Sequence, residues 1–256
     1  MIFDMKILLS PAKSLDFKSQ LPTEKNSYIC FEKEADYLNS ILRKKSPKDL
    51  SDLMAVSSKI ADLNYQRNQD WSLPFGPKNA RQAVYAFSGD VYRGLDAYTI
   101  DKDRIDFMQN SVRILSGLYG LIKPLDLIQP YRLEMSTKLS FESNKNLYDY
   151  WRKKISEQLN NELNENEPVL NLAGNEYFKA VDRKVIKSDI YTANFKQIKN
   201  GTYKTISIFS KRARGLMTRF IVKNNITNIN DLKSFDYDGY FFQENISSEK
   251  ELVFTR

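Results

Sequence analysis

The clearest strand signal in the chain is Met5-Lys6-Ile7-Leu8-Leu9, which runs directly into the turn Ser10-Pro11-Ala12-Lys13. This apolar run is short and stops at Ser10-Pro11, so it predicts a buried strand that leaves the core at its carboxyl end. Two further runs of this kind lie at Val112 to Leu115 and at Val169 to Leu172. The three runs predict a sheet of buried strands as the centre of the fold.

More strands are expected toward the C-terminus, where apolar and polar residues alternate. Between Ile190 and Phe209 two alternating segments flank Asn200-Gly201, whose tolerance of positive φ predicts a β-hairpin. The segments 240–242 and 252–254 predict a final pair of strands.

Helical patterns lie between these strands. Phe31, Ala35, Leu38 and Leu42 form one apolar stripe at helical spacing. Ser46-Pro47-Lys48-Asp49 offers an N-cap, a proline at the first helical position and an acidic third residue, which predicts a helix start. Further helices are expected at 60–67, 79–87 and 147–163. Because the order of helices and strands is not a regular βαβ alternation, the pattern predicts a mixed α/β (α+β) protein whose mixed sheet is flanked by helices.

Length and composition favour a single compact domain over residues 1–256. A chain of 256 residues can bury a substantial core, and its 41% hydrophobic and 28% charged residues are typical of globular proteins. No apolar run approaches the roughly 20 residues that a membrane helix needs, and the start lacks the pattern of a secretion signal. The single cysteine, Cys30, excludes an internal disulfide. We therefore expect a soluble, cytoplasmic protein that does not bind membranes.

The chain contains no histidine, and this excludes several classes of catalytic site. A Ser-His-Asp triad, a Cys-His dyad and a histidine-ligated zinc site are all impossible. An enzyme built from this sequence would have to use carboxylates, lysine or tyrosine as its acid and base. We expect no metal and no cofactor.

Positive charge is concentrated in one part of the chain. The net charge is +7, yet the segment 179–223 alone carries twelve basic residues against Asp182 and Asp189. Such a field attracts polyanions, because each neutralised phosphate releases counterions. A lysine-rich face that is merely solvated is the alternative.

Four segments combine turn residues with polar side chains. The first, Ser10 to Phe17, follows the first strand and brings Lys13 together with hydroxyl groups, where a simple polar turn is the alternative. The second, Phe87 to Leu95, has glycines five residues apart around Asp90, Tyr92 and Arg93, but it lacks the lysine ending of a P-loop. The third, Leu115 to Met135, presents Tyr119, Arg132 and Glu134; a turn region that crosses the core is the alternative reading of that segment.

The fourth segment, Ser210 to Phe220, predicts a helix whose first turn is cationic. Ser210 is the expected N-cap, which would place Lys211, Arg212 and Arg214 in the first turn. Cations there face the positive end of the helix dipole, at a cost of about 0.3 to 1 kcal/mol each. A bound anion would turn that repulsion into attraction.

The sequence resembles the YaaA family of bacterial peroxide-stress proteins over nearly its whole length, from Met5 to Arg256. Met1 to Asp4 precede the usual start of these proteins, which leaves Met1 and Met5 as alternative starts. The matching stretches are Leu9-Ser10-Pro11-Ala12-Lys13, Asn79-Ala80-Arg81-Gln82-Ala83, Gly89-Asp90-Val91-Tyr92, Leu115-Ser116-Gly117-Leu118-Tyr119-Gly120, Pro124-Leu125-Asp126-Leu127, Gln129-Pro130-Tyr131-Arg132-Leu133-Glu134-Met135, Asn175-Glu176-Tyr177-Phe178-Lys179 and Lys211-Arg212-Ala213-Arg214-Gly215-Leu216-Met217.

The resemblance implies a cytosolic protein that limits oxidative damage and is linked to low free iron and to DNA repair. It also implies a basic cleft and a helix-hairpin-helix element for DNA, which we place at 47–67. Such elements normally carry glycine in the turn, whereas Ser57 and Ser58 stand there, beside Lys59. A plain pair of core helices is the alternative.

These observations predict a protein that binds DNA, duplex or branched, with little sequence preference. The expected partners are DNA and DNA repair proteins, and we expect a monomer. The residues expected to contact phosphates are Lys13, Ser57, Ser58, Lys59, Arg67, Arg81, Arg93, Arg132, Lys179, Lys211, Arg212 and Arg214. The residues expected to line the cleft are Ser10, Asp90, Tyr92, Tyr119, Glu134 and Asn175.

Two other classes of function remain open at this point. One is an enzyme that acts on damaged nucleic acid or a nucleotide, such as a lyase with Lys13 as the amine that forms a Schiff base. The other is iron binding through carboxylates such as Asp126 and Glu134, although no di-iron motif is present. Cys30 is a weak candidate for a peroxide sensor, because its sequence neighbours are apolar and no second cysteine exists.

Overall fold

A computed structural model describes residues 5–199 and 201–256. Met1 to Asp4 and Asn200 lie outside the described residues. The structure therefore does not bear on the alternative starts at Met1 and Met5, and it describes only Gly201 of the expected Asn200-Gly201 turn. The strands are β1 (Lys6–Leu9), β2 (Arg81–Gln82), β3 (Val112–Ser116), β4 (Gly120–Ile122), β5 (Leu127–Ile128), β6 (Val169–Asn171), β7 (Ile190–Lys199), β8 (Thr202–Lys204), β9 (Phe241–Phe242) and β10 (Glu251–Thr255). The α-helices are α1 (Glu32–Arg43), α2 (Pro47–Met54), α3 (Ser58–Asp70), α4 (Ala83–Ala86), α5 (Asp90–Leu95), α6 (Ile105–Ser111), α7 (Leu147–Glu162), α8 (Asn175–Phe178) and α9 (Ser207–Asn224). The short 3₁₀ helices are η1 (Ala97–Thr99), η2 (Lys102–Arg104), η3 (Ile229–Ser234), η4 (Tyr237–Gly239) and η5 (Glu244–Ile246).

A mixed sheet forms the centre of the fold, in the order β4-β3-β1-β6-β7-β10-β9, with β8 paired to β7. The strands β3, β1, β6, β7 and β10 run parallel to one another, and β4, β9 and β8 pair antiparallel with β3, β10 and β7. Ile7 pairs with Val112 on one side and with Leu170 on the other. Because a strand between two parallel neighbours is covered on both faces, a continuous apolar run is what β1 requires. The predictions of mixed α/β architecture and of a buried first strand are confirmed.

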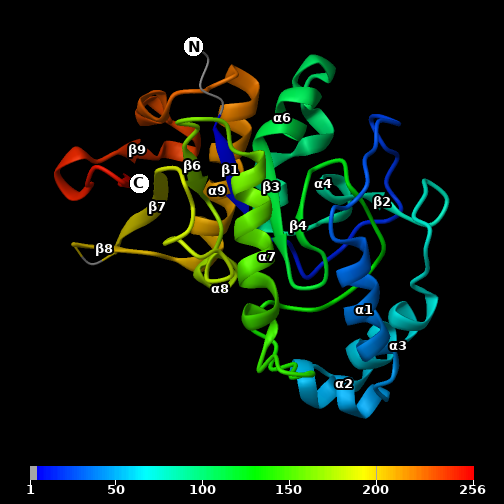
Figure 1. Cartoon of the computed structure of the whole chain (residues 1–256). Helices are drawn as coiled ribbons and strands as arrows, with labels where there is room; N and C mark the ends of the chain where they lie inside the picture. The colour runs from blue at the N-terminus through cyan, green and yellow to red at the C-terminus, as the bar shows by residue number, and fades with distance from the viewer. Residues whose placement is uncertain (1–4, 200) are drawn as a thin grey trace.

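The order in which successive strands are added to the sheet reverses at β1. The chain passes from β1 to β3 on one side, then through α7 to β6 on the other side. Figure 1 shows α7 in front of the sheet and α9 behind it. In parallel sheets, ligands bind outside the carboxyl ends of the strands at such a reversal. The loops that follow β1 and β6 are therefore the first place to look for a site.

The expected helix pair at 47–67 is present as α2 and α3, which lie together at the lower end of the molecule in Figure 1. The predicted start at Ser46 is confirmed, because the Ser46 and Asp49 side chains form a capping box and Pro47 is the first helical residue. The turn between the helices is made by Ala55, which adopts a left-handed conformation with φ 50°. The apolar stripe of α1 is also confirmed, since Ala35, Leu38 and Leu42 are buried.

Two element boundaries differ from the sequence prediction. The expected helix at 79–87 begins only at Ala83, because Arg81 and Gln82 pair with β5 as strand β2. The helix expected from Lys211 begins one turn earlier, at Ser207, and β8 ends at Lys204. Ser210 is the reason, because its side chain is buried on the same face as Ala213 and Met217, so the helical periodicity extends back through it. Within the described residues, no helix is long and apolar enough to cross a bilayer.

Candidate anion-binding cavity

A cavity of about 270 Å³ opens at the carboxyl ends of β1 and β6, where the chain reverses direction across the sheet. Four segments form its walls: the loop after β1, the start of α5, the segment after β6 that includes α8, and the second turn of α9. The lining residues are Ser10, Pro11, Ala12, Lys13, Ser14, Ser88, Gly89, Asp90, Val91, Gly174, Glu176, Tyr177, Lys211 and Arg214.

Two glycines bring α9 close enough for its cations to reach the cavity. A Cβ atom on Gly215 would lie 1.8 Å from the carbonyl oxygen of Val91, and one on Gly94 would lie 2.2 Å from that of Arg212. The backbones of α5 and α9 therefore cross in direct contact, which no larger residue allows at either position. This crossing fixes Lys211 and Arg214 over the start of α5.

The Arg214 guanidinium faces the cavity without a protein anion beside it. Its Nη1 lies 3.4 Å from where a Cβ atom on Gly174 would stand, and its Nε is buried without a hydrogen-bond partner. Burial lowers the pKa of this group, and no carboxylate of the described residues counteracts that effect. Buried charges in proteins are normally paired, so this guanidinium is a candidate contact for an external anion.

Ser10 is held with its hydroxyl at the same cavity. Its Oγ accepts a hydrogen bond of 2.8 Å from the backbone nitrogen of Gly174. Its carbonyl oxygen accepts one of 3.1 Å from the Tyr92 hydroxyl. The hydrogen on Ser10 Oγ is therefore left for an acceptor inside the cavity.

A second group of charged residues joins the cavity to the end of α3. Lys13 Nζ lies 2.7 Å from Glu134 Oε2, and Arg132 Nη2 lies 3.0 Å from Glu134 Oε1. Burial and the nearby Arg132 lower the pKa of Arg67 on α3. Arg132 Nε is buried and unpartnered. Lys13 and Arg132 thus share the single carboxylate Glu134, and Arg67 forms no ion pair among the described residues, which leaves an excess of positive charge.

The carboxylates of the cavity wall are bound to other partners. Asp90 pairs with Arg93 at 3.1 Å, and Glu176 accepts hydrogen bonds from the backbone and hydroxyl of Ser136. Neither forms an ion pair with Lys211 or Arg214 among the residues that the structure describes. The cations of α9 therefore remain free to hold an external anion.

The tyrosines near the cavity differ in their positions. Tyr177 lines the cavity, whereas Tyr92, which was expected to line the cleft, is buried outside the lining and donates to the Ser10 carbonyl. Desolvation raises the pKa of both tyrosines well above 10, so both are neutral hydrogen-bonding groups. The expectation that Tyr119 lines the cleft is wrong. Tyr119 is fully buried, accepts a hydrogen bond from Trp71 Nε1 at 3.1 Å and donates one to the carbonyl of Gln129. Its ring packs in the core against the rings of Phe75 and Tyr131.

Among the other expected site residues, Arg81 is directed away from the cavity. It is buried in β2, and its guanidinium donates to the Ser19 carbonyl at 2.6 Å and to the Tyr98 hydroxyl at 2.7 Å. These bonds give it a structural role, which a basic residue in a turn-rich sequence does not reveal. The expected residues that are exposed outside the cavity wall are Ser57, Ser58, Lys59, Arg93, Asn175, Lys179 and Arg212.

Sequence reasoning missed several residues of the cavity wall, namely Ser88, Gly174, Glu176 and Tyr177. It also placed the α9 cations in the first helical turn, whereas Lys211 is the fifth residue of α9. The free amides of that helix start are therefore not beside Arg214. Of the charge segment 179–223, Lys211 and Arg214 reach the cavity, while Arg219 donates to the carbonyls of Leu95 and Asp96.

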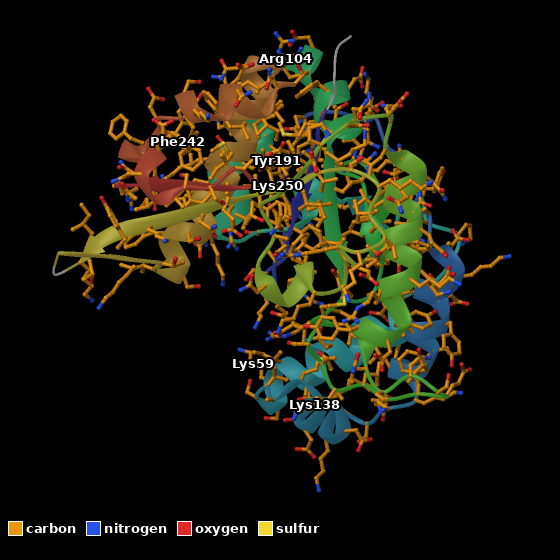
Figure 2. The ribbon with its side chains drawn as sticks, turned by 60° about the vertical axis from the view of Figure 1, so that its left-hand side comes forward. Lys59, Arg104, Lys138, Tyr191, Phe242 and Lys250 are labelled. Atoms are coloured by element: carbon orange, nitrogen blue, oxygen red, sulfur yellow. The ribbon has the colours of Figure 1, made fainter. Side chains whose placement is uncertain are left out.

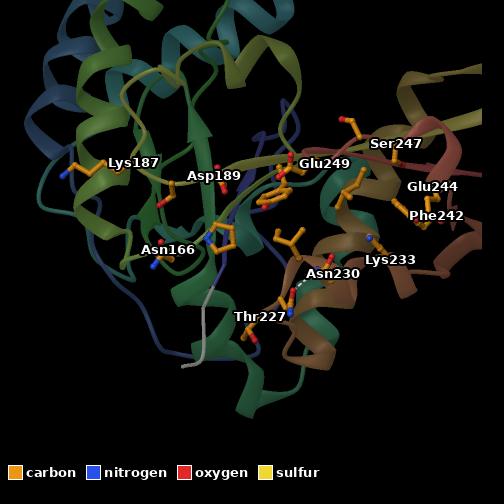
Figure 3. Close-up of a pocket in the computed structure, with 17 residues that line it drawn as sticks. Asn166, Lys187, Asp189, Thr227, Asn230, Lys233, Phe242, Glu244, Ser247 and Glu249 are labelled. Atoms are coloured by element: carbon orange, nitrogen blue, oxygen red, sulfur yellow. Dashed lines mark hydrogen bonds between the residues drawn. The ribbon is translucent and has the colours of Figure 1, made fainter.

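A larger cavity of about 860 Å³ lies at the amino ends of β6, β7 and β10. Figure 3 shows Lys187 and Lys233 there together with Asp189, Glu244 and Glu249, so its charge is mixed. The Lys233 ammonium lies 5.4 Å from the centre of the Phe242 ring. None of the expected site residues lines this cavity, whose lining contains acidic as well as basic side chains.

The carboxylates suggested for iron do not share a site. Asp126 accepts hydrogen bonds from Ser27 Oγ and from the backbone of Lys123, whereas Glu134 is bound to Lys13 and Arg132. In residues 5–199 and 201–256, no group of three acidic or cysteine side chains is arranged to hold a metal ion.

Cys30 has the wrong environment for a peroxide sensor. The residue is exposed at the surface, but its thiol donates to the Leu121 carbonyl at 3.3 Å, and desolvation there raises the pKa of the thiol to about 12. Since the thiolate is the reactive form, this residue is poorly activated.

Comparisons with known proteins identify the family. The sequence profile described as peroxide stress protein YaaA matches residues 5–246. The chain belongs to the YaaA family. A protein named UPF0246 from Flavobacterium johnsoniae is 52% identical over 252 residues, which cover 98% of this chain and 100% of that protein.

Other YaaA family relatives are similar over the same extent. UPF0246 proteins from Flavobacterium psychrophilum and Alteromonas mediterranea are 48% and 49% identical, and each alignment covers 98% of this chain. The alignments cover 100% and 98% of these two relatives. The family resemblance seen in the sequence is confirmed, and membership in it associates the chain with peroxide stress.

Proposed function

We propose that this YaaA family member binds DNA through its phosphate groups and thereby protects it under peroxide stress. The observation that carries the proposal is the unpaired Arg214 guanidinium, which faces a cavity shared with Lys13 and Lys211. An arginine in this state needs an anion, and phosphates are the anions that nucleic acids present at every nucleotide.

The surface beyond the cavity adds further support. Lys196, Lys199 and Lys204 lie on the β7–β8 hairpin, which extends away from the body of the molecule in Figures 1 and 2. The same hairpin exposes Ile198 and Tyr203, which face each other across the two strands. Cations beside exposed apolar side chains are typical of surfaces that contact single or distorted nucleic acid strands.

Binding with little sequence preference fits the packing of α9. Its residues Ala213, Met217 and Ile221 are buried, and Gly215 is in backbone contact with α5. A helix held in this way cannot enter the major groove to read bases. Contacts from this helix are therefore expected to go to phosphates.

The proposal is tested by measuring the affinity for a 5′-phosphorylated duplex as a function of salt. Arg214→Ala is expected to weaken binding by about tenfold, because a charge-assisted contact contributes about 1.5 kcal/mol, and to flatten the salt slope by about 0.9. The matched control is Arg104→Ala, which removes the same charge from η2 at the opposite end of the molecule from Lys59 (Figure 2). Equal losses in the two variants would contradict the proposal.

The geometry does not favour a lysine-dependent lyase. Lys13 Nζ is 2.7 Å from Glu134 Oε2, so the amine is engaged in an ion pair and is not free to attack a carbonyl. The link to iron, the DNA repair partners, the monomeric state and the cytoplasmic location remain predictions from the sequence and its resemblance. So does DNA contact by the α2–α3 pair.

A further inference from the structure

The space above Gly174 has the size of a single ligand atom. A Cβ atom there would lie 3.4 Å from Arg214 Nη1 and 3.6 Å from Ser10 Oγ, and both are ordinary contact distances. The φ angle of Gly174 is −72°, which any residue can adopt. Neither backbone strain nor a clash therefore requires glycine at this position. Because Gly174 has no side chain, the point between the Arg214 guanidinium and the Ser10 hydroxyl stays open.

The groups around this point are hydrogen-bond donors. Ser10 has an uncommitted hydroxyl hydrogen, Arg214 Nη1 lies beside this point, and the buried Nε of Arg214 has no protein partner. Lys211, which is also positively charged, adds a third hydrogen-bond donor from the same wall. The wall carboxylates Asp90 and Glu176 are held by Arg93 and Ser136. The complementary ligand is an anion whose oxygens only accept hydrogen bonds.

The size of the cavity limits how that anion is attached. A volume of about 270 Å³ is just below the roughly 300–1,000 Å³ of ordinary small-molecule pockets. The cavity can take a phosphate with part of one sugar. An internal phosphodiester would also require room for the nucleotides attached on both sides of the phosphate. A phosphate monoester carries a charge of about −1.5 to −2 at pH 7, against about −1 for a diester, and is therefore attracted more strongly by Arg214 and Lys211, which have no ion-pair partner among the described residues. The carboxylate of Glu176, which Ser136 binds but does not neutralise, opposes part of this attraction.

We propose that this cavity binds a phosphate monoester, as found at the phosphorylated end of a nucleic acid strand or in a nucleoside monophosphate. The inference rests on the proposed function, which requires only that the cations bind phosphate. It specifies in addition that the phosphate in the cavity is a monoester and not an internal diester. The open edge of the cavity would then direct the strand end toward the cationic surface.

The test compares the wild type with Gly174→Ala on three probes. These are a duplex with 5′-phosphate ends, the same duplex with hydroxyl ends, and adenosine monophosphate as a competitor. The added methyl group occupies the ligand's position without touching protein atoms closer than 3.4 Å, so the thermal midpoint should not change. Gly76→Ala is the matched control, because no atom lies within 4 Å of its new methyl group. Ser10→Ala is a second variant that removes a donor without adding bulk.

The wild type is expected to prefer the phosphorylated duplex by about tenfold, the effect of one charge-assisted hydrogen bond. Gly174→Ala and Ser10→Ala should lose this preference, and Gly76→Ala should keep it. Equal affinity of the wild type for both ends would overturn the inference and leave DNA binding intact. Monophosphate binding that Gly174→Ala abolishes, with no affinity for either duplex, would support the inference for free nucleotides and reject the proposed function. Binding to none of the probes would reject both.

Discussion

Asp126 is a buried carboxylate that holds the segment after β1 against the core. Its Oδ1 accepts a hydrogen bond of 2.6 Å from Ser27 Oγ, and its Oδ2 accepts one of 2.8 Å from the backbone of Lys123. The backbones of Ser27 and Asp126 also pair as an isolated bridge. Desolvation outweighs these bonds and raises the pKa of Asp126 to about 6. This side chain therefore makes the stability of the fold depend on pH.

A carboxyl group whose pKa is higher in the folded state binds its proton more tightly there. The contribution of protonated Asp126 to the unfolding free energy is therefore fully present below pH 4. It is lost as the pH rises through about 6, and the total loss is up to about 3 kcal/mol. Asp126→Asn removes the titration. We expect the unfolding free energy of the wild type, relative to this variant, to fall between pH 4 and pH 7 in urea denaturation. A constant difference over that range would show that Asp126 has an ordinary pKa.

The crossing of α5 and α9 is the element that assembles the cavity. Both helices contribute a glycine, Gly94 and Gly215, at the point of contact. Because the backbones touch, α9 cannot slide along α5 without creating clashes. The position of Arg214 relative to Ser10 and Gly174 depends on this contact, although the three residues lie on three different segments.

Gly215→Ala tests the crossing directly. Its methyl group would stand 1.8 Å from the Val91 carbonyl oxygen, so the helices must move apart. We expect a loss of about 1–3 kcal/mol in unfolding free energy together with weaker phosphate binding. Gly76→Ala, which meets no atom within 4 Å, should change stability by less than about 1 kcal/mol. Equal stability of the two variants would show that the backbones of α5 and α9 are not in direct contact at Gly215.

At the scale of the whole molecule, the basic segment 179–223 is divided among several surfaces. Lys211 and Arg214 line the candidate anion-binding cavity, and Lys187 lines the larger cavity at the opposite edge of the sheet. Lys199 and Lys204 are exposed on the β7–β8 hairpin. The structure therefore does not gather these cations into the one basic cleft that the family resemblance implies, but divides them between a cavity and a separate hairpin.

The hairpin is expected to contribute to DNA affinity without being part of the cavity. Replacing Lys196, Lys199 and Lys204 by glutamine should reduce the magnitude of the salt slope by about 0.9 for each phosphate contact that is lost. The preference for phosphorylated ends should stay unchanged. The control replaces the exposed lysines Lys44, Lys102 and Lys153, which lie on other elements. An unchanged slope in the hairpin variant would exclude contact between the hairpin and DNA.

Much of the fold could be predicted from local sequence. The apolar run of β1, the stripe of α1 and the capping box at Ser46 depend on residues close together in the chain, and all three are present in the structure. The family could be recognised for the same reason, because its motifs are short and contiguous. Local pattern therefore determined the elements, the mixed α/β class and the candidate loops.

Only the tertiary structure decided which polar side chains are committed to the protein and which are free. Lys6 is buried against Glu167 at 2.7 Å, and Arg81 is held by Ser19 and Tyr98, although nothing near them in the sequence indicates these partners. Arg214 differs because the crossing at Gly215 brings it to Ser10 without a carboxylate. Periodicity and capping act over a few residues, whereas the pairing of a charge depends on strand order and helix crossing, which join distant segments.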